Sequence, residues 1–212
     1  HAAAARIFGS GRVLSHPYAI PEMTDVFRAA AEVDKVLKVL GVPYVFIGGL
    51  ALQAWGEPRL TRDVDISLLT GFHNEEAIVD FLLSRLNGRI ANAKEHALRH
   101  RVLLLISKGG VGIDIGLAGF PFEQEMIERS VPVQFLPGIL LPAVTAEDLV
   151  VMKAFAGRDR DWDDIRGIVV RRDKSLQWDR IEASLGPLLE VKETPEDLQR
   201  LRSIRVECES GT

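Results

Sequence analysis

The sequence predicts an α/β (α+β) protein with a small mixed sheet flanked by helices and followed by an α-helical C-terminal region. Up to about residue 140, short apolar runs typical of strands alternate with segments of helical spacing. After Pro142 the periodic segments are helical only. The 212 residues, 47% of them hydrophobic, suffice for one compact domain with a small helical addition. We therefore expect an α/β domain at residues 20–142 and a helical region at residues 143–212.

The first elements surround a pair of glycines. Apolar residues at helical spacing predict a helix over residues 24–40, which Gly41 ends. A short β-branched run predicts a strand over residues 42–47, and after the glycines a short helix covers residues 50–55. Residues 63–69 alternate between polar and apolar side chains and then become apolar, which predicts a second strand.

The middle of the chain predicts a helix and a hairpin. Asn74 is a suitable N-cap for a helix that extends to about residue 86, with acidic residues in its first turn. Two apolar strands, over residues 101–107 and 111–117, are joined by a Lys-Gly-Gly turn that is typical of a hairpin. Residues 131–136 form a further candidate strand.

Helix start signals mark the C-terminal part of the chain. Thr145 is followed three residues later by Asp148, which is a capping-box pattern, and Thr194 precedes Pro195 in a second clear start. These signals and the apolar spacing predict four helices, at about residues 146–157, 161–172, 178–189 and 195–206.

Composition excludes several classes of protein. No stretch approaches 18 uninterrupted apolar residues, so we expect no membrane-spanning helix. The single cysteine, Cys208, cannot form an internal disulfide, which favours a reducing cytoplasm. The alanine-rich start of the chain lacks the long apolar region of a signal peptide, and residues 1 to about 16 are left out of the fold prediction.

The formal net charge of −4 argues against general attraction to nucleic acid. A local exception lies between Arg85 and Lys108, where six Lys or Arg and two His residues accompany a single acid, Glu95. This cluster has two interpretations. It is either a solvated helix-and-strand face or a landing surface for an anionic acceptor.

The most informative segment joins a strand, a turn and a second strand. The first strand ends in two glycines that lead directly into a helix, a short linker carries an arginine and a threonine, and the second strand begins with two aspartates. These residues are Gly48, Gly49, Arg59, Thr61, Asp63 and Asp65. The glycines would let a phosphate chain approach the backbone, and the helix N-terminus would favour its negative charge. An ordinary tight turn is the alternative explanation for the glycines.

The two aspartates stand at alternate positions of a predicted strand, so Asp63 and Asp65 should point to the same face. Carboxylates that close repel each other unless a cation lies between them or one of them is protonated. Oxygen ligands alone favour Mg²⁺ or Mn²⁺ over zinc. The alternative is a capping or ion-paired set with Arg59 and Arg62.

A third carboxylate is expected on a neighbouring strand. Asp114 is flanked by isoleucines in an otherwise apolar strand, where a lone charge is costly unless it is paired or binds a metal. Three aspartates can hold two divalent ions about 4 Å apart, which suits in-line displacement at phosphorus. A buried ion pair is the other explanation for Asp114.

In this order, these motifs resemble the polymerase-β-type nucleotidyltransferase superfamily, and their spacing is similar to its branch of AbiEii-type and MenT toxins. The resemblance continues at Lys153, which precedes an Arg-Asp-x-x-Asp run starting at Arg160. It implies a nucleotidyltransferase fold that transfers a nucleoside monophosphate from an NTP substrate to a hydroxyl acceptor. It also implies a tRNA acceptor and a cognate antitoxin protein as partners.

The resemblance further implies roles for individual residues. Asp63 and Asp65 would bind the metal, and Asp114 would bind a second metal and act as a base. Lys153 would contact the triphosphate, and Asp161 would be a second site residue from the helical region. Solvent-exposed positions are the alternative for the last two. Arg59 and Thr61 would line the site, Arg59 either holding a phosphate bidentately or neutralising Asp63.

Rival functions remain open at this point. The acceptor could instead be a protein side chain or a small antibiotic-like molecule. A non-catalytic nucleotide-binding or antitoxin-binding module is the rival from another class, although all three carboxylates are present. His73, His96 and His100 lack zinc-ligand spacing, and the chain has neither a Walker-type phosphate loop nor a Gly-x-Ser-x-Gly elbow.

Overall fold

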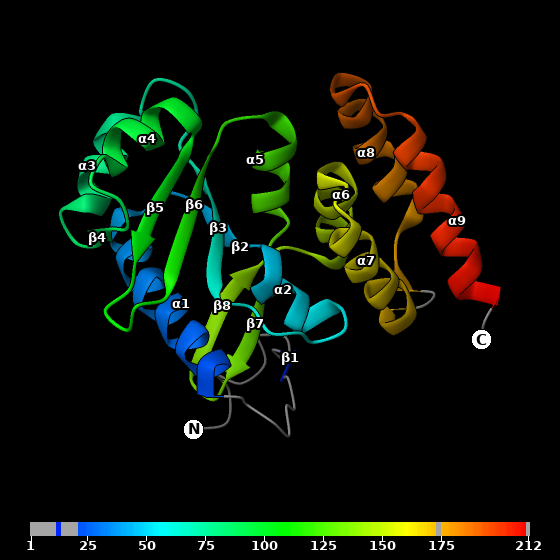
Figure 1. Cartoon of the computed structure of the whole chain (residues 1–212), viewed down its shortest axis with the longest axis horizontal. Coiled ribbons are helices and arrows are strands. Elements are labelled where there is room, and N and C mark those ends of the chain that lie inside the picture. Colours follow the sequence, from blue (N-terminus) through cyan, green and yellow to red (C-terminus); the bar gives the residue numbers. More distant parts are fainter. Residues whose placement is uncertain (1–11, 14–20, 173–174, 211–212) are drawn as a thin grey trace, which may run out of the picture.

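The structure, a computed structural model, describes residues 12–13, 21–172 and 175–210 (Figure 1). Most of the alanine-rich start of the chain lies outside the described residues. In the described part, one mixed sheet has the strand order β1-β7-β8-β2-β3-β6-β5-β4. Its strands are β1 (Arg12–Val13), β2 (Tyr44–Phe46), β3 (Asp63–Leu69), β4 (Asn87–Gly88), β5 (Val102–Ile106), β6 (Gly112–Ala118), β7 (Val131–Leu136) and β8 (Ile139–Ala143).

Helices cover the sheet and then form a group of their own. The helices that accompany the sheet are α1 (Pro21–Leu40), α2 (Gly48–Trp55), α3 (Glu75–Leu83), α4 (Ala93–His100) and α5 (Pro121–Glu128). Beyond the last strand the elements are α6 (Ala146–Ala156), α7 (Asp159–Arg172), α8 (Trp178–Lys192) and α9 (Glu196–Ser210). These four helices stand beside the sheet in Figure 1, and α2 packs against α6 and α7. The predicted fold class is confirmed. The division into two domains stays a prediction.

The central strand is β3, which pairs antiparallel with β2 and parallel with β6. Val64, Ile66 and Leu68 are at most 1% exposed and belong to one core cluster with Val33 and Leu37 of α1. Burying each such side chain stabilises the fold by about 2 kcal/mol. Because side chains alternate along a strand, β3 turns its other face, with Asp63 and Asp65, away from this apolar layer.

Most predicted elements are present, with small shifts at their ends. The strand at residues 63–69 and the strand at residues 131–136 have the predicted bounds. The hairpin at Lys108–Gly110 joins β5 to β6 as expected. Thr145 caps α6, because its side chain accepts a hydrogen bond from the backbone N–H of Asp148 at 3.2 Å.

Helices α4 and α5 and strand β8 were not predicted, because their sequences carry weak or contrary signals. In α4 and α5 the buried side chains are few, Ala93 and Ala97 in the first helix and Met126 and Ile127 in the second, so neither shows a clear apolar period. The strand β8 contains Pro142, a residue that argues against a strand in sequence alone. No helix of the described ranges is both long and apolar enough to cross a membrane.

The turn between β2 and α2 requires both of its glycines. Gly48 has φ +60°, and a Cβ there would lie 2.7 Å from Cγ of Asp65, with Oδ2 closer still. A Cβ on Gly49 would lie 2.5 Å from the hydroxyl oxygen of Thr61. Both glycines lie inside the first turn of α2, which begins two residues before the predicted start. The turn therefore presses directly against the strand and linker that carry the predicted site residues.

The close approach at Gly48 predicts a larger loss of stability on substitution than backbone strain alone would cause. Gly138→Ala is the matched control, because Gly138 has φ +79° and a Cβ there would meet no neighbouring side chain of the described residues within 4 Å. The control should lose about 1 kcal/mol from the left-handed conformation. Gly48→Ala should lose about 2 kcal/mol more, because Asp65 must move. Urea unfolding measures both, and equal losses would contradict this account of the turn.

Candidate active site

The three predicted carboxylates lie at one end of the paired strands β3 and β6. The register places Asp65 opposite Asp114 and Asp63 opposite Gly112. Neighbouring strands are about 4.8 Å apart, so Asp65 and Asp114 are adjacent across the sheet. Asp63 lies on the same strand face as Asp65, two residues away. The residues that the sequence pattern grouped together are therefore neighbours in the fold.

Asp65 is the most perturbed of the three carboxylates. Burial, followed by the charges of Asp63 and Asp114, raises its pKa from 3.8 to about 6. The backbone N–H of Gly49 and the charge of Lys153 act in the opposite direction but are weaker. Burial and the two neighbouring negative charges therefore disfavour the ionised form of Asp65. A bound cation would offset this repulsion.

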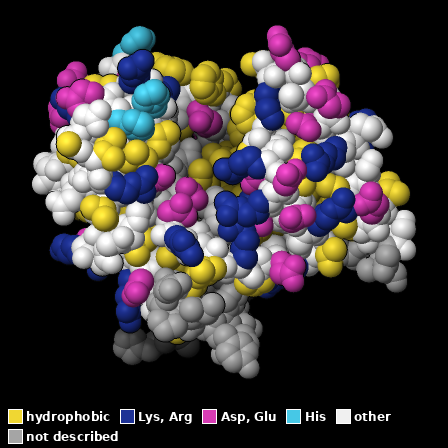
Figure 2. All heavy atoms as spheres, viewed as in Figure 1, with side chains coloured by type: hydrophobic (Ala, Val, Ile, Leu, Met, Phe, Trp, Pro, Cys, Tyr) yellow, Lys and Arg dark blue, Asp and Glu magenta, His cyan; other side chains and the backbone are white. Residues whose placement is uncertain are grey.

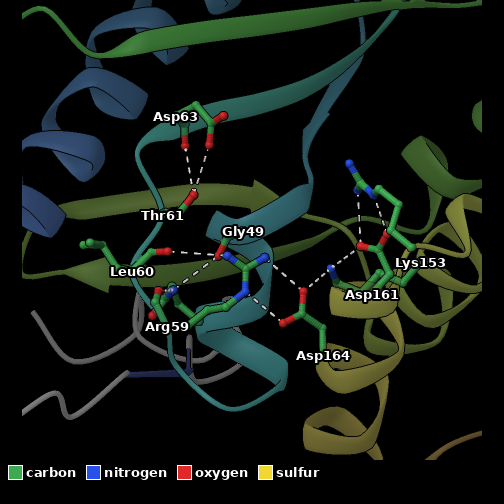
Figure 3. A network of polar contacts seen from close by, with 10 residues as sticks. Gly49, Arg59, Leu60, Thr61, Asp63, Lys153, Asp161 and Asp164 are labelled. Carbon is green, nitrogen blue, oxygen red and sulfur yellow. Dashed lines mark hydrogen bonds and ion pairs between the residues drawn. The ribbon is translucent and has the colours of Figure 1, made fainter.

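The other two carboxylates have partners of their own. The hydroxyl of Thr61 donates to Oδ1 of Asp63 at 3.2 Å, as Figure 3 shows. Nη2 of Arg89 pairs with Oδ1 of Asp114 at 2.8 Å. The pKa of Asp114 is raised by burial, and the negative charge of Asp63 adds to this, while the positive charge of Arg89 opposes it. Asp114 is therefore ion-paired in this structure, which was the alternative explanation for this residue.

The donor set fits a hard divalent cation, because three carboxylates from adjacent strands share one region beside a glycine turn. Their side chains are turned to Thr61, Gly49 and Arg89. Across residues 12–13, 21–172 and 175–210, no group of three or more His, Cys, Asp or Glu side chains is already arranged to hold a metal. The backbone therefore places the three aspartates close together, and their side chains would have to turn toward a cation to bind it.

Lys153 and Asp161, both predicted from the helical region, meet in a buried ionic network (Figure 3). The ammonium of Lys153 lies 3.3 Å from Asp161 and 2.6 Å from Asp164, and all three residues are at most 7% exposed. Lys153 is therefore not a solvated lysine. Its positive charge also lowers the pKa of Asp65 in β3, although less than burial and the neighbouring aspartates raise it.

Arg59 joins this network from the linker between α2 and β3. Its Nε and Nη2 atoms bond both carboxylate oxygens of Asp164, at 2.8 and 2.9 Å. Arg59 is thus bidentate as expected, but toward a carboxylate of α7, and Asp63 is a smaller influence on its raised pKa. Thr61 lies in the same linker, buried against Gly49.

The remaining charges of the network settle the protonation of its acids. Arg158 donates to Asp161 through Nε at 2.6 Å and Nη2 at 3.2 Å. Burial raises the pKa of Asp161, but Arg158 and Lys153 outweigh it and the pKa is lowered. For Asp164 burial is likewise outweighed, by Arg59 and Lys153, and its pKa is lowered too. Both acids are therefore ionised at neutral pH, and their two negative charges face the three positive charges of Lys153, Arg59 and Arg158.

Sequence reasoning did not single out Arg89 or Gln53, and it gave no role to Asp164, the last residue of the Arg-Asp-x-x-Asp run. Asp164 lies three residues after Asp161 and so on the same helix face, which was an available signal. Gln53 is fully buried, and its amide donates to the carbonyls of Gly49 at 3.3 Å and Arg59 at 2.7 Å, so it ties the linker to α2. Arg89 gave no signal beyond its place in the basic cluster.

The basic cluster between Arg85 and Lys108 is divided by the structure. Arg101 bonds inward to Glu75 and to the carbonyl of Leu117, and Lys94 pairs with Glu76 and Asp80. These two cations are therefore engaged by the protein itself. Figure 2 shows acidic side chains over the middle of the sheet with Lys and Arg side chains on both sides of them.

Comparisons with known proteins identify the family of this chain. The family described as "Nucleotidyl transferase AbiEii toxin, Type IV TA system" matches residues 36–173, which run from α1 to the end of α7. No curated protein sequence matches the chain.

Two solved structures are similar. The antibiotic-resistance factor ANT(2'')-Ia, in a solution structure, shares 14% identity over 84% of this chain and 98% of its own, with a TM-score of 0.51. An antigenic nucleotidyltransferase-like protein from Paracoccidioides brasiliensis shares 17% identity over 83% of this chain and 93% of its own, with a TM-score of 0.47. The first likeness bears on the fold alone. By its family match, the chain belongs to the AbiEii nucleotidyltransferase family.

Proposed function

We propose that this protein transfers a nucleoside monophosphate from an NTP to a hydroxyl acceptor, with Mg²⁺ or Mn²⁺ at Asp63, Asp65 and Asp114. One observation carries the proposal. Carboxylates of two adjacent strands lie beside a strand-to-helix turn that has no room for a Cβ at Gly48. Such a turn lets a phosphate chain approach the backbone, and the N-terminus of α2 favours anions.

The reaction is an in-line displacement at the α-phosphorus. The acceptor oxygen forms a bond to that phosphorus, the bond to the bridging oxygen breaks, and pyrophosphate leaves with the electron pair. Asp114 accepts the proton of the acceptor hydroxyl. Bound Mg²⁺ or Mn²⁺ supplies charge neutralisation and orientation of the phosphates. Most of the acceleration is positioning and electrostatic stabilisation.

The ionic network supplies the cations for the triphosphate. Lys153 and Arg59 now bind Asp161 and Asp164, and each exchanges part of this bonding for phosphate oxygens when NTP enters. Arg59 keeps the planar fork that suits a phosphate. Thr61 holds Asp63 through a hydrogen bond, and Asp161 holds Lys153 in place. These are the roles we propose for the nucleotide-binding residues.

The proposed acceptor is the 3′ end of a tRNA, with a protein side chain and a small antibiotic-like molecule behind it. The family description as a toxin of a type IV system supports a cognate antitoxin as partner and action in the cytoplasm. The likeness to an antibiotic-resistance factor keeps the small molecule among the candidates. A non-catalytic nucleotide-binding module would have the same fold without turnover.

Binding of NTP should depend on the divalent cation and on the two aspartates of β3. We expect Asp63→Ala/Asp65→Ala to bind Mg·NTP at least about tenfold more weakly than wild type, a loss of about 1.4 kcal/mol or more. Asp163→Ala is the matched control, since Asp163 is exposed on α7. Isothermal calorimetry with and without Mg²⁺ measures this. Unchanged, metal-independent binding by the double variant would refute the proposed site.

The acceptor can be found by label transfer. Wild type incubated with α-labelled NTPs should label total tRNA, and Asp114→Asn should label it at least about a hundredfold less, as expected for a lost general base. Transfer should fall steeply with rising salt if the acceptor is a nucleic acid. Label on protein or on a small hydroxylated compound would replace tRNA as acceptor, and NTP binding without any transfer would identify a non-catalytic module.

The raised pKa of Asp65 predicts how stability depends on pH without metal. Between about pH 4 and pH 6 the folded protein holds a proton that the unfolded chain releases, so the free energy of unfolding falls as the pH rises. The loss is on the order of 2 kcal/mol. Asp65→Asn should remove it, and Mg²⁺ should restore stability to wild type at neutral pH. Urea unfolding on either side of this window measures both, and a pH-independent difference between the proteins would argue against it.

A further inference from the structure

Arg89 reaches the carboxylate group from the edge of the sheet. Its backbone N–H donates to the carbonyl of Leu104 in β5 at 2.9 Å, which fixes the chain just after β4. Leu104 pairs in turn with Asp114 in β6. From this anchor the side chain crosses β5, and its Nη2 atom lies 2.8 Å from Oδ1 of Asp114.

Gly112 makes room for this crossing. A Cβ on Gly112 would lie 2.5 Å from Nη1 of Arg89 and 3.9 Å from Cβ of Asp63. Gly112 is also the residue opposite Asp63 in the register of β3 and β6. The guanidinium therefore occupies space next to both Asp63 and Asp114, where a cation shared by these two carboxylates would bind.

Arg89 is also the cation that acts on Asp114. The groups that influence this carboxylate are its own burial, the positive charge of Arg89 and the negative charge of Asp63. The side chains of Arg89 and Asp114 are 33% and 29% exposed, so the pair borders solvent. The paired oxygen, Oδ1 of Asp114, is itself buried and accepts no hydrogen bond from the described residues, so the contact with Arg89 is an ion pair alone. A partly exposed pair of this kind is weak enough to be exchanged for another partner.

We propose that Arg89 is a positioning residue that blocks Asp114 until a phosphate-bearing acceptor binds. Paired with Oδ1 of Asp114, its guanidinium takes the position that a cation at this carboxylate would need. An acceptor phosphate draws the guanidinium away, because guanidinium binds phosphate in a planar, bidentate manner. Asp114 then becomes available to bind a divalent cation and to accept the acceptor's proton. This inference rests on the proposed function and adds to it a link between acceptor binding and the third carboxylate.

The first test needs no turnover. Mn²⁺ binding is measured by electron paramagnetic resonance without nucleotide, for wild type, Arg89→Gln, Arg89→Lys and the control Arg99→Gln on the exposed face of α4. Arg89→Gln should bind Mn²⁺ about fivefold more tightly, because no ion pair has to break. Arg89→Lys and Arg99→Gln should bind as wild type. Adding Asp114→Asn to Arg89→Gln should abolish the gain.

Unchanged or weaker Mn²⁺ binding by Arg89→Gln would overturn the proposal, because Arg89 would then support the site or have no influence on it. Thermal unfolding monitored by circular dichroism confirms that each variant is folded. Two further variants keep the test valid should Arg89→Gln fail to fold. Gly112→Ala should bind Mn²⁺ more tightly than wild type, because its Cβ displaces the guanidinium of Arg89. Arg89→Lys, which keeps a positive charge, should bind Mn²⁺ with the affinity of wild type.

The second test separates this inference from the proposed function. We expect Arg89→Gln to hydrolyse NTP without acceptor several times faster than wild type and to have a raised KM for a phosphate-bearing acceptor. Equal hydrolysis by both proteins would overturn the proposal. If no protein hydrolyses NTP or transfers label to any acceptor, the proposed function fails, while the Mn²⁺ comparison still decides whether Arg89 competes with a cation at Asp114.

Discussion

The site depends on one steric constraint, the absence of a Cβ where the turn before α2 meets Asp65. Because Gly48 adopts φ +60° and presents only hydrogen to this carboxylate, α2 can begin directly over β3. The same approach lets the N–H of Gly49 bond Asp65 and seats Gly49 on Thr61. A wider turn would separate the anion-favouring helix end from the carboxylates, and the phosphate and metal functions would no longer share one place.

A second constraint is ionic and ties three distant segments together. Arg59 of the linker, Lys153 of α6 and Asp164 of α7 form one ionic network, in which Lys153 and Asp164 are buried and Arg59 is partly exposed. Buried ion pairs seldom add much stability, but removing one partner costs several kcal/mol, because the other charge is left unpaired. The network therefore fixes where the helical region stands relative to the linker more than it strengthens the fold. It places cations from separate parts of the chain near the carboxylates of β3.

Local sequence patterns predicted the strands and helices that carry the site. They did not predict which side chains form ion pairs, because those pairs depend on the tertiary structure. The alternation in residues 63–69 gave β3 its bounds and placed Asp63 and Asp65 on one face. Asp114 could be predicted because a charge within an apolar strand demands a partner. Arg89 could not, since β4 is a two-residue strand without apolar signal and its register with β5 arises only in the fold. Arg59 could be predicted as a site residue. Its partner Asp164 could not, because Asp164 lies 105 residues later in the sequence.

The ion pairs within the site explain how a protein of net charge −4 can be suited to a polyanionic ligand. Four cations near the carboxylates already have acidic partners: Arg89 has Asp114, Arg158 has Asp161, Arg59 has Asp164, and Lys153 contacts both Asp161 and Asp164. The protein therefore needs no large positive net charge to hold these cations in the site. Ligand binding becomes an exchange of partners, in which phosphates take over the cations and divalent ions take over the acids. Such an exchange avoids leaving any buried charge unpaired, which is the most costly state available to this site.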